Sequence, residues 1–230
     1  MGKRDIIYED NDIIICHKPA GIATQTRRIG QQDMESFIRN YRAAKNEPPY
    51  VGIVHRLDQP VEGVMVFAKN QKAAASLSRQ IKEHTTEKYY RAASRGQGVS
   101  GTDKKEADND QAWHTLTDYI CFDKRTNTSK ITSEKDRLAK KAVLQYRVIS
   151  VTPDRDNSQN ECIKTEFDIK LLTGRHHQIR LQLANIGYPL IGDTKYGCTG
   201  GFAREQLALC SYKIVFDHPA TGERMTFELS

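Results

Sequence analysis

The segment His55-Arg-Leu-Asp58 places a carboxylate next to a guanidinium group, directly after the apolar residues 51–54. A carboxylate can act as a nucleophile or as a general base, and a neighbouring Arg favours its ionised form. A strand that ends at such a loop holds its base in place, so that the side chains can act on a substrate. Taken alone, an Arg and an Asp in a loop more often form a solvated turn. The pair is therefore a candidate site that needs further support.

A second group of polar side chains occupies residues 172–180, Leu-Thr-Gly-Arg-His-His-Gln-Ile-Arg, between an expected strand and an expected helix. Backbone amides at a helix start, together with Arg and His side chains, can bind an anion such as a phosphate. By composition alone, a helix-capping turn with ordinary surface bases explains the segment equally well.

A third segment, Lys88-Tyr-Tyr-Arg91, puts two adjacent aromatic residues on opposite faces of an expected strand. One tyrosine could stack on a nucleic-acid base while the other enters the core. Packing of both tyrosines in the core is the commoner outcome.

Short strands and three helices are expected to position these segments. Alternation and turn residues predict strands in residues 6–17 (two, around an acidic turn), 51–54, 64–68, 88–93, 142–152, 162–172, 207–216 and 224–229. Helical spacing predicts helices at residues 34–45, with Asp33 as N-cap, 70–83, capped by Asn70, and 178–186. Residues 96–141 are interpreted mainly as surface loops that could contain short strands such as 117–122. This pattern predicts a mixed α/β or α+β domain on a largely antiparallel sheet.

The composition favours a globular protein with an anionic partner. The net charge is +6 and the pI is about 9.0, which favours polyanions through phosphate neutralisation, although many soluble proteins are equally basic. The five cysteines show neither a C-x-x-C pair nor zinc spacing. Without an export signal, we expect reduced thiols and a cytoplasmic location. The adjacent His176 and His177 diverge in any regular structure, so we expect no metal site.

Several protein classes are disfavoured. No apolar run approaches the roughly 20 residues that span a bilayer, and no G-x-S-x-G, P-loop or Rossmann fingerprint is present. The sequence therefore gives no physical case for a hydrolase triad, an NTPase or a dinucleotide enzyme.

Together, the three polar segments resemble the RluA-type family of pseudouridine synthases. Residues 54–63, Val-His-Arg-Leu-Asp-Gln-Pro-Val-Glu-Gly, are similar to the family signature H-R-L-D-x-x-T-S-G. Residues 173–180 and 186–193 resemble T-G-R-x-H-Q-I-R and I-G-x-P-I-x-G-D. Residues 88–92 match K-x-Y-x-A, and residues 16–21 resemble N-K-P-x-G. The motifs occur in the family's order and cover nearly the whole chain, with residues 96–141 the weakest part.

The resemblance implies an α+β pseudouridine synthase fold: a mixed, mostly antiparallel central sheet flanked by helices and loops, with an active-site cleft across the sheet. It implies one catalytic domain over residues 1–230 without an S4-like domain. Asp58 matches the catalytic aspartate that attacks the target nucleoside while the uracil detaches, turns and rejoins through C5. Tyr90 matches the tyrosine that stacks on the uracil and is implicated in C5 proton removal. Arg180 matches the basic residue that pairs with the aspartate.

The resemblance also suggests how RNA is held. Arg56 would contact RNA around the flipped nucleotide, and Leu181 would form part of the apolar wall under the base. Arg175, His177 and Gln178 are the remaining candidate RNA contacts. The implied partner is structured RNA, either tRNA or ribosomal RNA, with no cofactor, no metal, no membrane and no protein partner. We expect a monomer.

Two departures from the family pattern leave alternatives open. Val61 and Glu62 replace the usual Thr-Ser, and His176 stands where a small hydroxyl residue is common. An inward Glu62 would act as a like charge on Asp58 and raise its pKa. We expect Glu62 to face solvent, because Asp58, Arg56, Tyr90 and Arg180 are all retained. One alternative is a catalytically silent RNA-binding protein that retained the fold, although retention of Asp58 argues against it. Another is an unrelated basic α/β enzyme that acts on a small anionic substrate.

Overall fold

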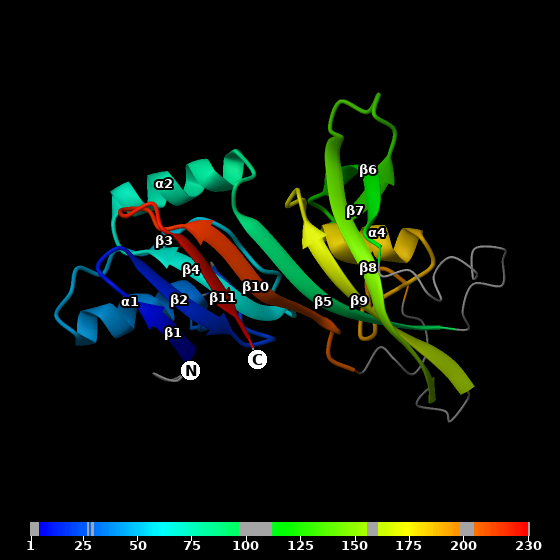
Figure 1. Cartoon of the computed structure of the whole chain (residues 1–230), viewed down its shortest axis with the longest axis horizontal. Coiled ribbons are helices and arrows are strands. Elements are labelled where there is room, and N and C mark those ends of the chain that lie inside the picture. The colour runs from blue at the N-terminus through cyan, green and yellow to red at the C-terminus, as the bar shows by residue number, and fades with distance from the viewer. Residues whose placement is uncertain are drawn as a thin grey trace. The chain divides into compact units, whose positions relative to one another are not determined.

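The structure is a computed structural model that describes residues 5–26, 28, 30–96, 112–155, 161–197 and 205–229 of the chain. It divides into two compact units (Figure 1). The first consists of Met1–Lys88 and Cys210–Ser230, and the second of Tyr89–Leu209. No helix among the described residues is long and apolar enough to cross a membrane.

The first unit is built on a mixed sheet. Its strands are β1 (Ile6–Glu9), β2 (Ile13–Lys18), β3 (Gly52–Ile53), β4 (Glu62–Ala68), β10 (Leu209–Asp217) and β11 (Arg224–Glu228). The order is β1-β2-β4-β10, with β3 paired to β4 and β11 paired to β10. All these pairs are antiparallel except β10 with β4. Their buried side chains form a core with Ala73 and Leu77 of a helix, because alternate residues of each strand point to the same face.

Two helices belong to this unit, and both begin where the sequence predicts. Helix α1 (Met34–Ala44) starts at Asp33, whose carboxylate accepts the Ser36 amide at 2.7 Å. Helix α2 (Gln71–Lys82) starts at Asn70, whose side-chain oxygen accepts the Ala73 amide at 2.9 Å. In both cases the side chain satisfies an amide that has no partner within the helix.

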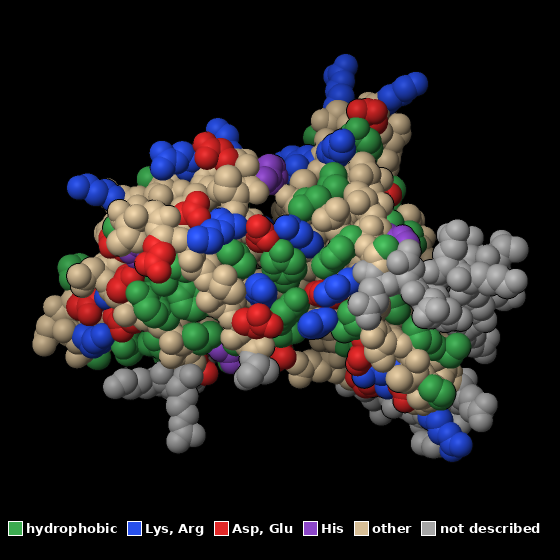
Figure 2. All heavy atoms as spheres, in the orientation of Figure 1, with side chains coloured by type: hydrophobic (Ala, Val, Ile, Leu, Met, Phe, Trp, Pro, Cys, Tyr) green, Lys and Arg blue, Asp and Glu red, His purple; other side chains and the backbone are tan. Residues whose placement is uncertain are grey.

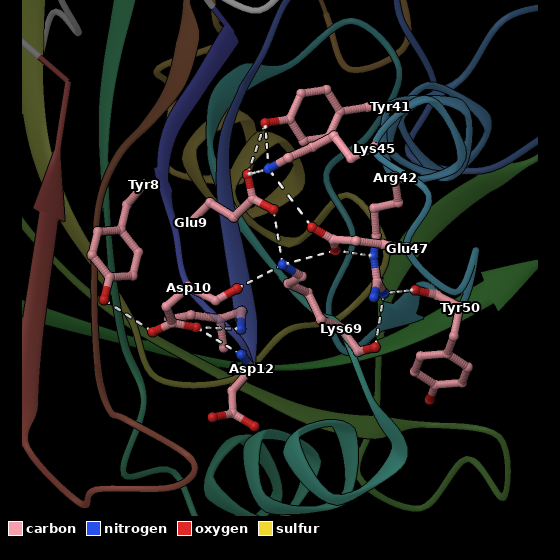
Figure 3. Close-up of polar contacts among 11 residues, drawn as sticks. Tyr8, Glu9, Asp10, Asp12, Tyr41, Arg42, Lys45, Glu47, Tyr50 and Lys69 are labelled. Carbon is pink, nitrogen blue, oxygen red and sulfur yellow. Dashed lines mark hydrogen bonds and ion pairs between the residues drawn. The ribbon is translucent and has the colours of Figure 1, made fainter.

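A cluster of ionic side chains joins β1, α1 and the segment before β3 to the end of β4 (Figure 3). The buried Lys69 ammonium lies 2.8 Å from a Glu9 oxygen and 3.0 Å from a Glu47 oxygen. The buried Arg42 guanidinium donates to Glu47 and to the backbone oxygens of Tyr50 and Lys69. Burial alone would raise the pKa of Glu9, but hydrogen bonds from cationic neighbours lower it to about 2. The cluster therefore holds α1 against the sheet with paired charges.

The second unit is an antiparallel sheet with one described helix. Its strands are β5 (Glu87–Gly96), which begins in the first unit, β6 (His114–Asp123), β7 (Thr128–Thr132), β8 (Lys140–Arg155) and β9 (Glu161–Leu171), in the order β5-β9-β8-β6-β7. Helix α4 (Gln178–Asn185) contacts β6 and β7. The buried Gln182 of α4 donates to the Asp118 carboxylate of β6 at 2.7 Å, which fixes the helix on that face of the sheet.

The interpretation of residues 96–141 as mainly loops was wrong for 114–132. Strands β6 and β7 form a hairpin there, with Tyr119 opposite Thr132, and β6 pairs with β8 from His114 to Ile120. Thr115 and Thr117 hide the strand, because both are polar and exposed, and the residues that alternate with them are only half-buried. The predicted short strand 117–122 is confirmed as part of β6. Residues 97–111 of this stretch lie outside the described part of the chain.

Candidate active site

The loop that carries Asp58 is held through the residue before it. The Thr24 hydroxyl contacts both backbone groups of Leu57: it accepts from the amide at 3.1 Å and donates to the carbonyl at 3.0 Å. Leu57 is buried, Asp58 is half-buried and Arg56 is exposed. The side chains of Arg56 and Asp58 therefore stay at least partly accessible, while Thr24 fixes the backbone of the loop.

A buried lysine fixes the other side of this loop. Lys18, at the end of β2, has no exposed surface, and its Nζ donates to the carbonyls of Pro19 at 3.1 Å, Ile22 at 2.6 Å and Gln59 at 3.2 Å. Burial lowers the pKa of Lys18 to about 8, although Asp58 and Glu62 act to raise it. An ammonium group thus lies close enough to Asp58 for the two charges to interact. The residue types alone did not point to Lys18.

Glu62 does not simply face solvent as expected. It is half-buried at the start of β4, opposite Cys210 of β10. Burial, followed by the Glu62 charge and hydrogen bond, raises the pKa of Cys210 to about 11. Glu62 also acts on the Lys18 ammonium. Its charge is therefore partly balanced by a buried cation, which accounts for an acidic residue at this position.

His55 supports the same loop in its neutral form. Its Nε2 accepts the Val66 amide of β4 at 3.1 Å. Burial lowers the pKa of His55 to about 3, and the Lys88 charge acts in the same direction. Arg56, the next residue, reaches the Gln25 side-chain oxygen with Nη2 at 2.9 Å.

In the second unit, Arg180 forms a buried two-point ion pair. Its Nε and Nη2 each lie 2.7 Å from one oxygen of Asp193, and its Cζ lies 5.3 Å from the Tyr196 ring centroid. Burial alone would raise the pKa of Asp193, but the Arg180 hydrogen bond and charge hold it below its ordinary value. This fork geometry fixes the guanidinium plane. The pairing of Arg180 with Asp58 stays a prediction, because the two residues belong to different units.

His177 is a buried turn residue. It has a left-handed backbone with φ 54°, and its Nδ1 lies 2.8 Å from the Tyr196 hydroxyl. Burial, then the Arg180 and His176 charges, lower the pKa of His177 to about 3. The His176 ring stacks on it at 3.7 Å, and its Nδ1 lies 3.0 Å from the Ser129 hydroxyl. His176 therefore contacts β7, which is a structural role for this departure from the family pattern.

The remaining candidates of this segment differ in accessibility. Gln178 is buried, and its side-chain oxygen accepts the Thr173 hydroxyl at 2.8 Å and the Arg175 amide at 3.0 Å. Arg175 and Leu181 are half-buried, and Arg175 Nε donates to the Lys141 carbonyl at 2.8 Å. Direct RNA contacts by these residues stay predictions.

The two tyrosines of β5 point to opposite faces of the sheet, as the alternation predicts. Tyr90 is buried, opposite Ile169 of β9. Tyr89 is half-buried, and Lys170 Nζ lies 5.4 Å from its ring centroid.

One cluster among the described residues has the composition of a metal site. Ligand atoms of Asp10, Asp12 and His218 lie within 4.8 Å of one another. However, Asp10 accepts two backbone amides with Oδ1 and contacts Tyr8 and His218 with Oδ2. His218 Nδ1 accepts the Thr221 amide at 3.1 Å, so Nε2 carries the proton toward Asp10. Protein hydrogen bonds alone account for this arrangement.

Comparison with known proteins supports the resemblance. The chain matches the family model described as RNA pseudouridylate synthase over residues 12–185. It is 33% identical over 228 residues to an uncharacterized RNA pseudouridine synthase of Bacillus subtilis (strain 168), covering 99% of this chain and 68% of that protein. It is 31% identical over 242 residues to the ribosomal large subunit pseudouridine synthase D of Vibrio cholerae, covering 97% of this chain and 66% of that protein. The chain thus spans about two thirds of the length of these relatives.

Solved structures show the same fold. Human RNA pseudouridylate synthase domain containing 1 matches with a TM-score of 0.72 and 23% identity, covering 98% of this chain and 82% of the human one. Human RNA pseudouridylate synthase domain containing 4 matches with a TM-score of 0.72 and 19% identity, covering 99% and 88%. The α+β fold is therefore the pseudouridine synthase fold.

Proposed function

The chain belongs to the RNA pseudouridylate synthase family, a family of isomerases, and from this premise we propose that Asp58 is its catalytic carboxylate. The observation that carries the proposal is the way the Asp58 loop is held. Thr24 fixes the backbone of the preceding residue and Lys18 binds the carbonyl of the following one. Such fixation preorganises a side chain for chemistry.

The proposed reaction is an isomerisation that begins with base flipping. The target uridine leaves its stack so that Asp58 can attack the nucleoside. The glycosidic bond to N1 breaks, the uracil turns, and a carbon–carbon bond forms to C5. The bond between the nucleoside and the Asp58 carboxylate breaks again, so that Asp58 is regenerated. The C5 proton is lost and N1 gains a proton, so the product has the same atoms as the substrate. The reaction needs no electron transfer.

We assign Tyr90 and Arg180 to this reaction as well. Tyr90 would stack on the detached uracil and take part in C5 proton removal. Arg180 would supply positive charge near Asp58, with Asp193 holding its guanidinium in one orientation. These roles require the two units to act as one catalytic domain over residues 1–230.

Arg56, Leu181, Arg175, His177 and Gln178 are proposed to shape the RNA-binding site. Exposed Arg56 is suited to a direct phosphate contact. Buried His177 and Gln178 are better suited to hold the shape of the segment than to touch RNA. Leu181 would line the uracil site.

The substrate is proposed to be structured RNA, with ribosomal RNA tested before tRNA. The support is the printed name of relatives such as the Vibrio cholerae enzyme, a ribosomal large subunit pseudouridine synthase. We propose that the protein acts as a monomer in the cytoplasm.

The test is pseudouridine mapping on total RNA from cells with and without the gene. Cells that lack the gene are complemented with wild type, with Asp58→Asn, or with the matched control Asp217→Asn in β10. We expect one or more sites to vanish on deletion and to return with wild type and the control, but not with Asp58→Asn. If Asp58→Asn restores the sites, Asp58 is not the catalytic group. RNA binding without any mapped site would favour a silent RNA-binding protein.

A further inference from the structure

The sheet of the second unit has two faces of different character. Helix α4, the one helix that the structure describes in this unit, lies against the face that carries Asp118, through Gln182. Tyr90 and Ile169 point to that same face. Asp118 lies opposite Ala142 of β8, and Tyr146, four residues further along β8, lies opposite Ile169, which in turn lies opposite Tyr90. Residues that alternate with them point to the opposite face. In Figure 1 the helix lies behind β8, so this opposite face is turned to the viewer.

Two neighbouring rows of side chains define what we call the outer patch. The register aligns Tyr89, Lys170, Gln145 and Thr115 in the first row, and Arg91, Asp168 and Arg147 in the second, with Trp113 next to Arg147 just before β6 begins. The rows thus cross β5, β9, β8 and the start of β6. Figure 2 shows Lys and Arg side chains, with some Asp and Glu, among hydrophobic ones over β5 and β9 on this side.

Each of the two aromatic rings of the outer patch lies beside a cation. Arg147 Cζ lies 4.9 Å from the Trp113 ring centroid, and Lys170 Nζ lies 5.4 Å from that of Tyr89. Trp113 is 38% exposed, so part of its ring is accessible. Both rings therefore present polarised aromatic surface beside a positive charge.

The charge of the outer patch is positive. Asp168 is almost wholly buried beneath two arginines, at 2.8 Å from Arg147 and 3.8 Å from Arg91. With Lys170, three cations surround one carboxylate, so the patch carries a net charge of +2. In the next two rows the cations are paired, because Glu166 lies 2.6 Å from Lys164, and Arg95 lies 2.6 Å from both Asp154 and Glu205. The positive charge is thus concentrated around Trp113 and Tyr89.

We propose that the outer patch binds a single-stranded stretch of RNA that flanks the structure containing the target uridine. Single strands are held by aromatic side chains and Arg planes that stack on bases, beside a basic surface that follows the phosphates. Sheet faces that carry such aromatics are an established way to bind unpaired RNA. The inference rests on the proposed function for the identity of the RNA, but it concerns a face that does not carry Tyr90. The positive charge favours RNA over an apolar protein segment.

The test compares binding of a labelled oligouridylate strand by wild type and by Trp113→Ala/Lys170→Gln. Both side chains are partly exposed, so we expect the variant to fold, and thermal unfolding checks this. The matched controls are Lys72→Gln on the exposed surface of α2 and Trp113→Phe, which keeps a stacking ring. We expect the double variant to bind about tenfold or more weakly. The slope of log affinity against log salt should fall by about 0.7. Both controls should stay within about twofold of wild type.

Other outcomes have defined meanings. An unchanged affinity and salt slope for a folded double variant would overturn the proposal. An equal loss with Lys72→Gln would also overturn it, because the effect would then be general charge. On the RNA identified by mapping, the defect is expected in KM rather than kcat. If wild type binds the strand through the outer patch but modifies no RNA, the proposed catalytic function fails while this inference stands.

Discussion

The loop around Asp58 and residues 172–180, which lead into the first turn of α4, both follow strands and both carry Arg beside acidic or polar groups, yet they use these residues differently. In the first, Arg56 is exposed and Asp58 half-buried, and buried neighbours such as Lys18 fix the backbone. In the second, Arg180 is itself buried and its donors are bound to Asp193. The first loop leaves Arg56 and Asp58 accessible, whereas in the second segment Arg180 is hydrogen-bonded within the protein. Residue type alone therefore does not distinguish a reacting group from one that holds the site.

The largest expected effect is on catalysis, from Asp58→Asn in the first loop. The substitution keeps the shape of the side chain but removes the carboxylate, so we expect kcat to fall at least about 10³-fold. The free energy of unfolding should change little. Single-turnover formation of pseudouridine on the mapped RNA measures the rate, and Asp217→Asn serves as the matched control. A variant that keeps a tenth of wild-type activity would show that Asp58 does not react.

In the second segment, removing the charge that binds Arg180 should cause a large loss of stability. Asp193→Asn leaves the Arg180 guanidinium buried without its counter-charge, which costs about 3–5 kcal/mol. Arg56→Ala removes an exposed side chain bound to Gln25 and should stay within about 0.5 kcal/mol of wild type. Urea unfolding measures both. Equal losses in the two variants would contradict the distinction between the loops.

Much of the fold could be predicted from local pattern. Asp33 and Asn70 cap the helices that they were expected to cap, because capping depends on residues only three positions apart. The β6–β7 hairpin was largely missed, because Thr115 and Thr117 lack the apolar run that marks a strand. Alternation with one buried face is a weaker signal than continuous hydrophobicity.

The site could be predicted only as far as its motifs extend. The segment around Asp58 is a candidate from its residue types, and the family resemblance assigns its role. The supports are contacts between distant residues: Lys18 reaches Gln59, and Thr24 reaches Leu57. Two signals were available for Lys18. It is the lysine of the segment that resembles N-K-P-x-G, and it follows the apolar residues 13–16, where a buried lysine needs a specific set of acceptors.

The two segments should contribute similarly to the loss of protein stability at acid pH, since each contains a histidine that is neutral in the folded state. The pKa values of His55 and His177 are lowered to about 3, whereas the unfolded chain takes up a proton near pH 6.5. Between about pH 6 and 4 the unfolded state therefore binds more protons, and stability falls as the pH falls.

We expect each of His55→Gln and His177→Asn to reduce this dependence by about 1.4 kcal/mol per pH unit. Asn tolerates the left-handed backbone at position 177. Urea unfolding at several pH values measures the slope. A slope that is unchanged in both variants would mean that these histidines are charged in the folded protein or that other groups determine acid unfolding.

One threonine supports each of the two segments by holding the backbone or a side chain of that segment through its hydroxyl, and loss of either hydroxyl should have a small effect on stability. Thr24→Val removes the hydroxyl that binds both backbone groups of Leu57. Thr173→Val removes the hydroxyl that binds the Val143 amide and Gln178. Each should cost about 1 kcal/mol of stability.

Only Thr24 binds the residue next to Asp58, so kcat should fall several-fold for Thr24→Val and much less for Thr173→Val. Thr24→Ser, which keeps the hydroxyl, should restore kcat. If both valine variants lower kcat equally at equal stability, the Asp58 loop has no special dependence on its own support, and the catalytic geometry is set by both segments together.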